Sequence, residues 1–249
     1  MKLLALDFDG VISDSARESF RVALRTWSAL FPAHPLPRRA GDGALYRAFL
    51  ELMPLGNRAE DYGVALASIR AEEPLADQAA YDAFKARLGE DFLHSFHRRF
   101  YVEREALAAA DPVAWRDLMR PYPELPDILR RHAGEVALAI ASSKDRRSVR
   151  RLLESYGMED LFPEGRVLDK EAGVSKRAHV ERLAAGQGVP PAEITFVDDK
   201  VNHLESVAPL GARCVLAAWG YNGERERRIA CREGFLVCAL EDFEAKVFG

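Results

Sequence analysis

The segment that decides the fold is Leu3–Asp14, which reads LLALDFDGVISD. Its short apolar run, Leu3–Leu6, predicts a buried strand, and two carboxylates follow one residue apart where this strand ends. Because side chains alternate along a strand, Asp7 and Asp9 are expected to project to the same side. Two like charges this close need a positive partner, so the pair predicts a site that binds a cation.

Two other interpretations fit part of this segment. The dipeptide Asp9-Gly10 is by itself typical of a turn, because glycine lets the backbone bend sharply. Alternating acids also begin EF-hand calcium loops, but such a loop needs a third oxygen ligand and glycine at its sixth position. Here the glycine is fourth, and Val11 and Ile12 follow it, which excludes the calcium loop. A simple turn stays open as the alternative.

The composition is that of a soluble globular protein. The 249 residues, 48% hydrophobic and 30% charged, suffice for a large core and a second module. A formal net charge of −4 gives no electrostatic reason to expect nucleic acid or a membrane as partner. Cys214, Cys231 and Cys238 lack metal-ligand spacing and suit reduced thiols. Since we find neither a signal peptide nor an apolar run of membrane length, a cytoplasmic location is expected.

The remaining strands are expected in the second half of the chain. Buried apolar runs predict four of them, at Val136–Ala141, Ile194–Val197, Ala212–Ala218 and Phe235–Leu240. Helical patterns separate these strands, at Arg146–Tyr156, Lys176–Ala185 and His203–Leu210. Alternating strands and helices are typical of crossover units. We therefore predict an α/β fold with a Rossmann-like parallel sheet and helices on both faces.

Between Ser15 and about Arg120 the pattern is helical. Helices are expected at Ala16–Leu30, Ala44–Leu52, Ala59–Glu72, Tyr81–Phe100 and Val113–Met119. We predict a core domain of residues 1–14 and 121–249, with residues 15–120 inserted after the first strand. Because ligands of parallel sheets bind at the carboxyl ends of the strands, the insert is expected to cover that edge. An independent helical domain is the alternative, but it would separate the first strand from its sheet.

Two other predicted strands also end in polar residues. Ser142 and Ser143 precede a helix, where hydroxyls and free amides hold phosphate groups. Taken alone, this segment is better explained by Ser143 or Asp145 capping that helix. Asp198 and Asp199 end a buried strand, and burying two charges predicts a counter-ion. The alternative, attraction of acids to a helix N-terminus, accounts for one aspartate better than for two. Lys176 begins the predicted helix that precedes this strand, and it is a candidate to neutralise the charge at Asp7.

Together these motifs resemble the haloacid dehalogenase-like superfamily. Its four motifs are a DxD at the first strand, a Ser or Thr at the second, a Lys before a later helix and an acidic pair at the fourth strand. They match, in order, Asp7-Phe8-Asp9, Ser142, Lys176 and Asp198-Asp199. The insert after the first motif looks like the helical C1 cap of the phosphoglycolate phosphatase and β-phosphoglucomutase branch. Trp219–Tyr221 also looks like a segment common in phosphoglycolate phosphatase-like members.

The resemblance implies a role for each matching residue. Asp7 would become an aspartyl-phosphate, and Asp9 would protonate the leaving oxygen and then activate water. The groups holding phosphoryl oxygens would be Ser142, Ser143, Lys176 and Gly10, with Lys170 as the alternative lysine. Mg²⁺, a hard cation suited to carboxylates and substrate phosphate, would be held by Asp7, Asp9 and the acids of the fourth motif.

One departure from the family pattern affects the metal ligands. Many members have Gly-Asp in the fourth motif and a further acid four residues after that Asp. Here Asp198 replaces the glycine, and His203 occupies the later position. We therefore assign metal contact to Asp199 first and to Asp198 second.

The expected function is magnesium-dependent hydrolysis of a small phosphorylated metabolite. The presence of Asp9 argues against dehalogenase and phosphonatase relatives. A phosphomutase, which uses the same four motifs, is the alternative; an inactive fold with a binding or regulatory function would be expected to have a damaged motif. Arg58 and Arg98 of the insert are candidates to bind a second anionic group of the substrate, or are simply solvated. His94 and His97 are interpreted as surface histidines.

Overall fold

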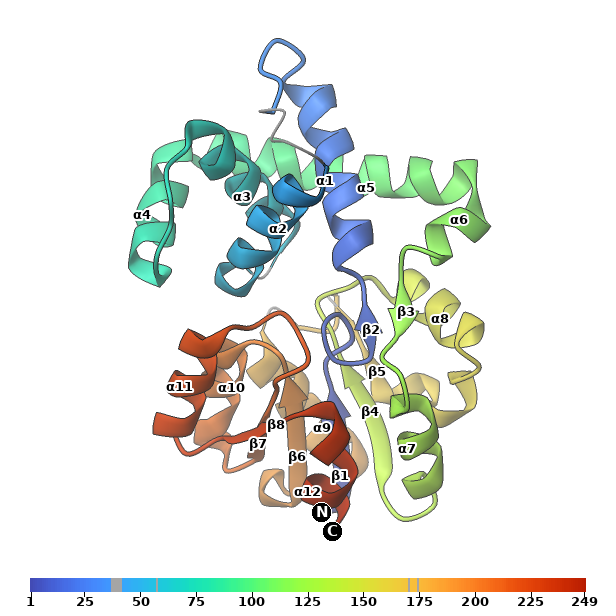
Figure 1. The fold of residues 1–249 in the computed structure, drawn as a ribbon. Coiled ribbons are helices and arrows are strands. Elements are labelled where there is room, and N and C mark those ends of the chain that lie inside the picture. Colours follow the sequence, from blue (N-terminus) through green and yellow to red (C-terminus); the bar gives the residue numbers. More distant parts are fainter. Residues whose placement is uncertain (37–41, 57, 170, 174) are drawn as a thin grey trace. The chain divides into compact units, whose positions relative to one another are not determined.

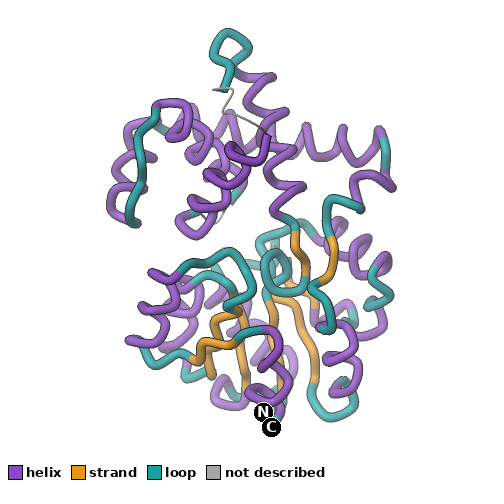
Figure 2. Tube along the Cα trace, in the orientation of Figure 1, coloured by secondary structure: helices purple, strands orange, loops and turns teal. Residues whose placement is uncertain are grey.

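The computed structural model describes the chain except for residues 37–41, 57, 170 and 174. The chain divides into two compact units, one formed by Met1–Asp14 with Arg120–Gly249 and the other by Ser15–Met119. Among the described residues, strands occur in the first unit, and the second is helical (Figure 2). The interpretation of the helical unit as a cap stays a prediction.

The first unit is built on a six-stranded parallel sheet in the order β5-β4-β1-β6-β7-β8 (Figure 1). Its strands are β1 (Leu3–Leu6), β4 (Ala137–Ala141), β5 (Val167–Leu168), β6 (Ile194–Asp198), β7 (Arg213–Ala217) and β8 (Leu236–Cys238). The apolar β1 lies in the middle, paired with β4 on one side and β6 on the other. Burial of the four residues of β1 fits this central position, since a central parallel strand is covered on both faces.

Helices connect the strands, as parallel pairing requires. They are α7 (Leu125–His132), α8 (Arg146–Ser155), α9 (Lys176–Gln187), α10 (Val201–Val207) and α11 (Glu224–Arg232), and a further helix, α12 (Phe243–Phe248), follows the last strand. One face of the sheet forms a core with α9, α10 and α11, in which Leu3 and Ala5 pack with Val180 and Leu204. The predicted α/β class with a Rossmann-like sheet is confirmed.

Three short strands of the described part of the chain were not predicted from the sequence. β5 has two residues and pairs with the end of β4. β2 (Ser13–Asp14) and β3 (Arg120–Pro121) pair antiparallel where the chain passes from one compact unit to the other. Two residues are too few to show the alternation by which a strand is recognised in a sequence.

The helical unit contains α1 (Ala16–Leu30), α2 (Asp42–Leu52), α3 (Ala59–Ala71), α4 (Gln78–Leu88), α5 (Glu90–Ala110) and α6 (Pro112–Arg116). The prediction of one helix over Tyr81–Phe100 is wrong, because Gly89 separates α4 from α5. Its φ of +79° lies in the left-handed region, which glycine adopts without strain and which ends a helix.

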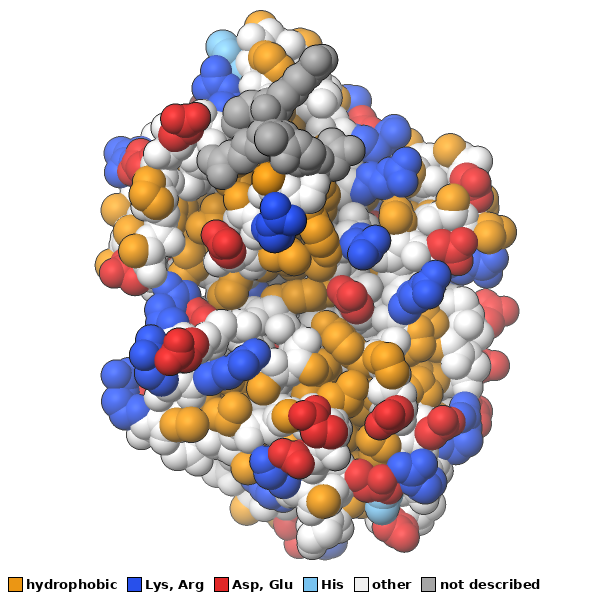
Figure 3. Space-filling model, in the orientation of Figure 1, with side chains coloured by type: hydrophobic (Ala, Val, Ile, Leu, Met, Phe, Trp, Pro, Cys, Tyr) orange, Lys and Arg blue, Asp and Glu red, His pale blue; other side chains and the backbone are white. Residues whose placement is uncertain are grey.

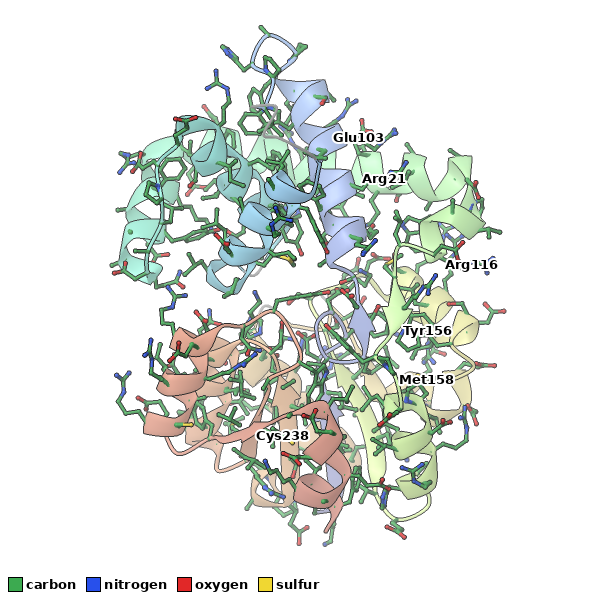
Figure 4. All side chains as sticks on the ribbon, viewed as in Figure 1. Arg21, Glu103, Arg116, Tyr156, Met158 and Cys238 are labelled. Atoms are coloured by element: carbon green, nitrogen blue, oxygen red, sulfur yellow. The ribbon has the colours of Figure 1, made fainter. Side chains whose placement is uncertain are left out.

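A buried ion pair and a hydrogen bond to it connect three helices of this unit. Arg104 of α5 donates two hydrogen bonds, of 2.7 and 2.9 Å, to Glu18 of α1, and Trp115 of α6 donates a third of 3.2 Å. Next to Arg104, Glu103 (labelled in Figure 4) accepts from Arg25 and Arg99. These contacts give the insert a polar network in addition to its apolar core.

The surface carries charges of both signs. In Figure 3, Lys and Arg side chains are interspersed with Asp and Glu on the visible face. Within the described residues, none of the helices combines the length and the apolar character needed to cross a membrane. Cys214, Cys231 and Cys238 are free thiols.

Candidate active site

The carboxyl ends of three neighbouring strands bring the predicted residues to one edge of the sheet. Asp7 directly follows β1, Ser142 follows β4, and Asp198 is the last residue of β6. The backbone amide of Asp7 donates to the carbonyl of Val197 at 2.9 Å, which continues the ladder between β1 and β6 to the site. Since adjacent parallel strands end at the same edge, this placement follows from the strand order.

Lys176 connects all three strand ends. Its Nζ lies 2.6 Å from Asp7 Oδ1, 3.2 Å from Asp198 Oδ2 and 2.6 Å from the carbonyl oxygen of Ala141. The Lys176 side chain is 2% exposed, so its interactions with the two carboxylates are only weakly screened. Although burial alone would lower it, the pKa of Lys176 is raised by Asp198 and Asp7. The ammonium group stays charged and holds the two aspartates together.

Asp198 has partners at both of its carboxylate oxygens. Its Oδ1 accepts from the Lys200 amide at 2.9 Å and lies 3.0 Å from His203 Nδ1, while its Oδ2 faces Lys176. Burial alone would raise the pKa of Asp198, but His203 and Lys176 hold it below its usual value. His203 is therefore a side-chain partner of Asp198 in this structure.

Asp199 is in the opposite situation. Its pKa is raised to about 8, mainly by burial and in addition by the charges of Asp198 and Asp7, against the influence of Lys200. Its Oδ2 accepts one hydrogen bond, of 2.8 Å, from the backbone amide of Tyr221. Burial also raises the pKa of Asp7, to about 6, although Lys176 opposes the shift. The edge therefore holds more buried negative charge around Asp7 and Asp199 than its lysines compensate.

Asp199→Asn is expected to stabilise the metal-free protein at alkaline pH. Folding raises the pKa of Asp199 from 3.8 to about 8. Between these pH values the folded protein binds more protons at Asp199 than the unfolded chain does, so stability falls as pH rises through this range. The amide removes this penalty, and Tm at pH 8 with EDTA should rise by about 5 °C. Asp127→Asn, an exposed control, should leave Tm unchanged. A variant whose Tm falls with pH as steeply as the wild type contradicts the assignment.

Lys144 was not among the predicted residues. Its Nζ lies 3.0 Å from Oδ1 and 3.3 Å from Oδ2 of Asp9. The Lys144 side chain is 1% exposed, and its backbone amide donates to Ser142 Oγ at 3.0 Å. Its position two residues after Ser142, the predicted phosphate-binding serine, could have indicated a site residue, but the sequence did not show that Lys144 contacts Asp9.

Gly10 lies against Asp199. Its φ is +82°, and a Cβ at this position would be 2.3 Å from Asp199 Oδ2, so the close approach requires glycine. The Gly10 amide donates to the carbonyl of Ser13 at 2.9 Å. Ser142 is buried and Ser143 is exposed. Binding of phosphate by Gly10, Ser142 and Ser143 stays a prediction.

The other candidates lie elsewhere or outside the described residues. Arg58 and Arg98 belong to the helical unit; both are exposed, and Arg98 lines a hollow of about 330 Å³ on α5. Their role in specificity stays a prediction. His97 has an acidic partner, Glu60, with 2.7 Å between Nδ1 and Oε2, which the sequence did not reveal. Lys170 lies outside the described residues.

Two sets of side chains at this edge offer ligands for a cation, one that includes Asp198 and one that includes Asp199. Ligand atoms of Asp7, Asp198 and His203 all lie within 4.8 Å of one another. However, Lys176 already contacts both of these aspartates, and its ammonium group would repel a second cation there. Burial and the neighbouring aspartates raise the pKa of Asp199 in spite of Lys200, so its negative charge is poorly compensated. The donor set of Asp7 and Asp199 therefore fits a hard divalent cation better.

The fold and the acidic edge define an α/β protein with a carboxylate-rich site at its central strand. A sequence model of the haloacid dehalogenase-like hydrolases matches residues 1–211. The chain belongs to this family, as its motifs indicated.

Two curated relatives are 28% identical to the chain over part of its length. They are phosphoglycolate phosphatase of Synechococcus elongatus, over 119 residues (46% of this chain and 54% of the relative), and human magnesium-dependent phosphatase 1, over 106 residues (42% and 58%). The chain thus spans little more than half the length of these relatives.

A solved structure supports the fold over the whole chain. The crystal structure of a predicted phosphoglycolate phosphatase from Haemophilus somnus superposes with a TM-score of 0.68. It is 20% identical and covers 100% of this chain and 98% of its own. At this identity the likeness concerns the fold alone.

Proposed function

We propose that the protein hydrolyses a small phosphomonoester with the help of Mg²⁺, through a phosphorylated Asp7. The observation that carries this proposal is Lys176, whose ammonium group joins the ends of β1, β4 and β6 and holds Asp7 at 2.6 Å. A buried carboxylate fixed beside a buried cation, at the edge where parallel sheets bind ligands, is suited to nucleophilic attack.

Asp7 is the proposed nucleophile. Its Oδ1 accepts from the Phe8 amide at 2.7 Å and from Lys176, which fixes the orientation of the carboxylate. With a pKa of about 6, Asp7 is mainly ionised at neutral pH and above. A carboxylate oxygen attacks phosphorus, the bond to the leaving oxygen breaks, and water later releases phosphate from Asp7. Lys176 and Ser142 are proposed to hold phosphoryl oxygens during both steps.

The residues present fit a magnesium ion. We propose that Asp7 and Asp199 hold it through their carboxylates and Asp9 through its backbone carbonyl, with Asp198 in second place. When bound, Mg²⁺ would neutralise the carboxylates and the phosphoryl oxygens of the substrate. The name of the human relative, magnesium-dependent phosphatase 1, agrees with this choice of ion.

Asp9 is the proposed general acid and base, and Lys144 is proposed to position its carboxylate. Asp9→Asn should lower kcat by about 10²–10⁴-fold. With p-nitrophenyl phosphate, whose leaving group needs no protonation, the first step should survive while hydrolysis of the phosphorylated Asp7 slows. Rapid mixing should therefore show a burst of p-nitrophenolate followed by slow release. Steady turnover at the wild-type rate contradicts this role.

The substrate class is tested with a panel of phosphorylated metabolites, each with Mg²⁺ and with EDTA. Free phosphate should appear from at least one small phosphomonoester, and EDTA should abolish its release. Phosphoglycolate belongs in the panel because a curated relative and a solved structure carry that name. An isomerised sugar phosphate in place of free phosphate would indicate a mutase, and release that is insensitive to EDTA would contradict the role of Mg²⁺.

A further inference from the structure

The segment Trp219–Asn222, which follows β7, contacts two parts of the candidate site. The Trp219 indole Nε1 donates to the carbonyl of Val11 at 3.0 Å. The Tyr221 amide donates to Asp199 Oδ2 at 2.8 Å, and the Tyr221 hydroxyl donates to Asp14 Oδ1 at 3.1 Å. The segment therefore links the loop after β1 with the acid after β6.

Asn222 is the residue that fixes this segment to the backbone of the site. Its Nδ2 donates to the carbonyl of Asp199 at 3.2 Å and to that of Ala217 at 2.8 Å. Its Oδ1 accepts from Arg227 Nε at 3.0 Å, and Arg227 also donates to the carbonyl of Ala218 at 2.7 Å. Three partners of fixed polarity determine the orientation of the amide, with its nitrogen toward Asp199.

The packing at this point allows little displacement. A Cβ at Gly220 would lie 2.3 Å from the carbonyl oxygen of Gly10 and 2.4 Å from Asp199 Cβ. A Cβ at Gly10 would in turn meet the Asp199 carboxylate and the ring of Tyr221. Gly10 and Gly220 thus pack closely against the side chain of Asp199, so a shift of the segment would displace the carboxylate.

We propose that Asn222 is a positioning residue for the divalent-cation site, acting through the main chain of Asp199 without touching the ion or the substrate. The inference rests on the proposed function, in which Asp199 is a metal ligand. Outer hydrogen bonds of this kind hold a ligand in the orientation that binds the metal, and their loss typically weakens binding about 10–100-fold.

The decisive variant is Asn222→Asp, which keeps the shape of the side chain and its pairing with Arg227. It removes both N–H donors and places a carboxylate oxygen against the carbonyls of Asp199 and Ala217, which repel it. Titration calorimetry of the full chain with MgCl₂, without substrate, should show a Kd raised by about 10–100-fold. At saturating Mg²⁺, kcat should return to within a few-fold of the wild type, with KM for the phosphomonoester unchanged.

Two further variants complete the test. Asn222→Ala loses the donors without adding repulsion and should weaken Mg²⁺ binding less; it also serves if the aspartate variant does not fold. Arg228→Ala changes an exposed residue of α11, the helix that follows Asn222, where Arg228 pairs with Glu224; this variant should bind Mg²⁺ as the wild type does. Wild-type affinity in both Asn222 variants overturns the positioning role alone, whereas a wild-type protein that binds no Mg²⁺ overturns the proposed function as well.

Discussion

Asp7→Asn is expected to lower kcat for phosphomonoester hydrolysis by a factor on the order of 10⁴ or more, because an amide cannot take the phosphoryl group. The fold should not suffer. The amide oxygen can still accept from the Phe8 amide, and Asp198 still faces the Lys176 ammonium group. Removing a buried carboxylate whose pKa is raised to about 6 also removes a cost of folding near neutral pH.

The Asp7 variant is measured by phosphate release and by thermal unfolding in parallel. Tm should equal or exceed that of the wild type while activity disappears. Asp160→Asn, which changes an exposed acid of the same unit, should keep both activity and Tm. Phosphate release by the Asp7 variant at more than about a tenth of the wild-type rate would refute the nucleophile assignment, since no removed nucleophile leaves so much activity.

Lys176→Met is expected to have the largest effect on stability. It leaves Asp7 and Asp198 buried without the cation that contacts both, and breaking such a buried pair costs about 3–5 kcal/mol. For a chain of this size, Tm should fall by about 10 °C. Activity should fall by about 10²–10³-fold, because a charge aimed at the phosphoryl oxygens is lost.

A double variant separates the two effects of Lys176. Lys176→Met combined with Asp198→Asn removes one positive and one negative charge, so most of the lost stability should return. Activity should stay low, since the phosphoryl contact is still missing. A single Lys176→Met variant with Tm within about 2 °C of the wild type would show that the ion pairs contribute little to folding.

Much of the sheet edge could be predicted from local sequence. A short apolar run that ends in Asp7 implies a buried strand with a carboxylate at its end, and the same reasoning applies to Asp198. Parallel strands place their carboxyl ends together, which is why Asp7, Ser142 and Asp198 reach one edge. Lys176 could also be predicted as a site residue, because it begins the helix that leads to β6.

The features that the sequence did not predict depend on contacts between residues far apart in the chain or on the backbone conformation of a single residue. Lys144 pairs with Asp9 across 135 positions of sequence, and no periodic pattern records such a pairing. The bonds of Asn222 to two main-chain carbonyls are likewise invisible in sequence, although its neighbours Trp219–Tyr221 had been noted. Gly89 divides a continuous helical pattern into α4 and α5 through its backbone conformation alone.

The proposed function depends on one step, the transfer of the phosphoryl group to Asp7 during turnover. The most direct test stops the reaction during the p-nitrophenyl phosphate burst and reduces the protein with borohydride, which converts an acyl phosphate to an alcohol. Peptide mass mapping should then find homoserine at position 7 in the wild type, more of it in Asp9→Asn, and none in Asp7→Asn. Reduction at a different residue, or a full burst with position 7 unmodified, would show that Asp7 is not the nucleophile.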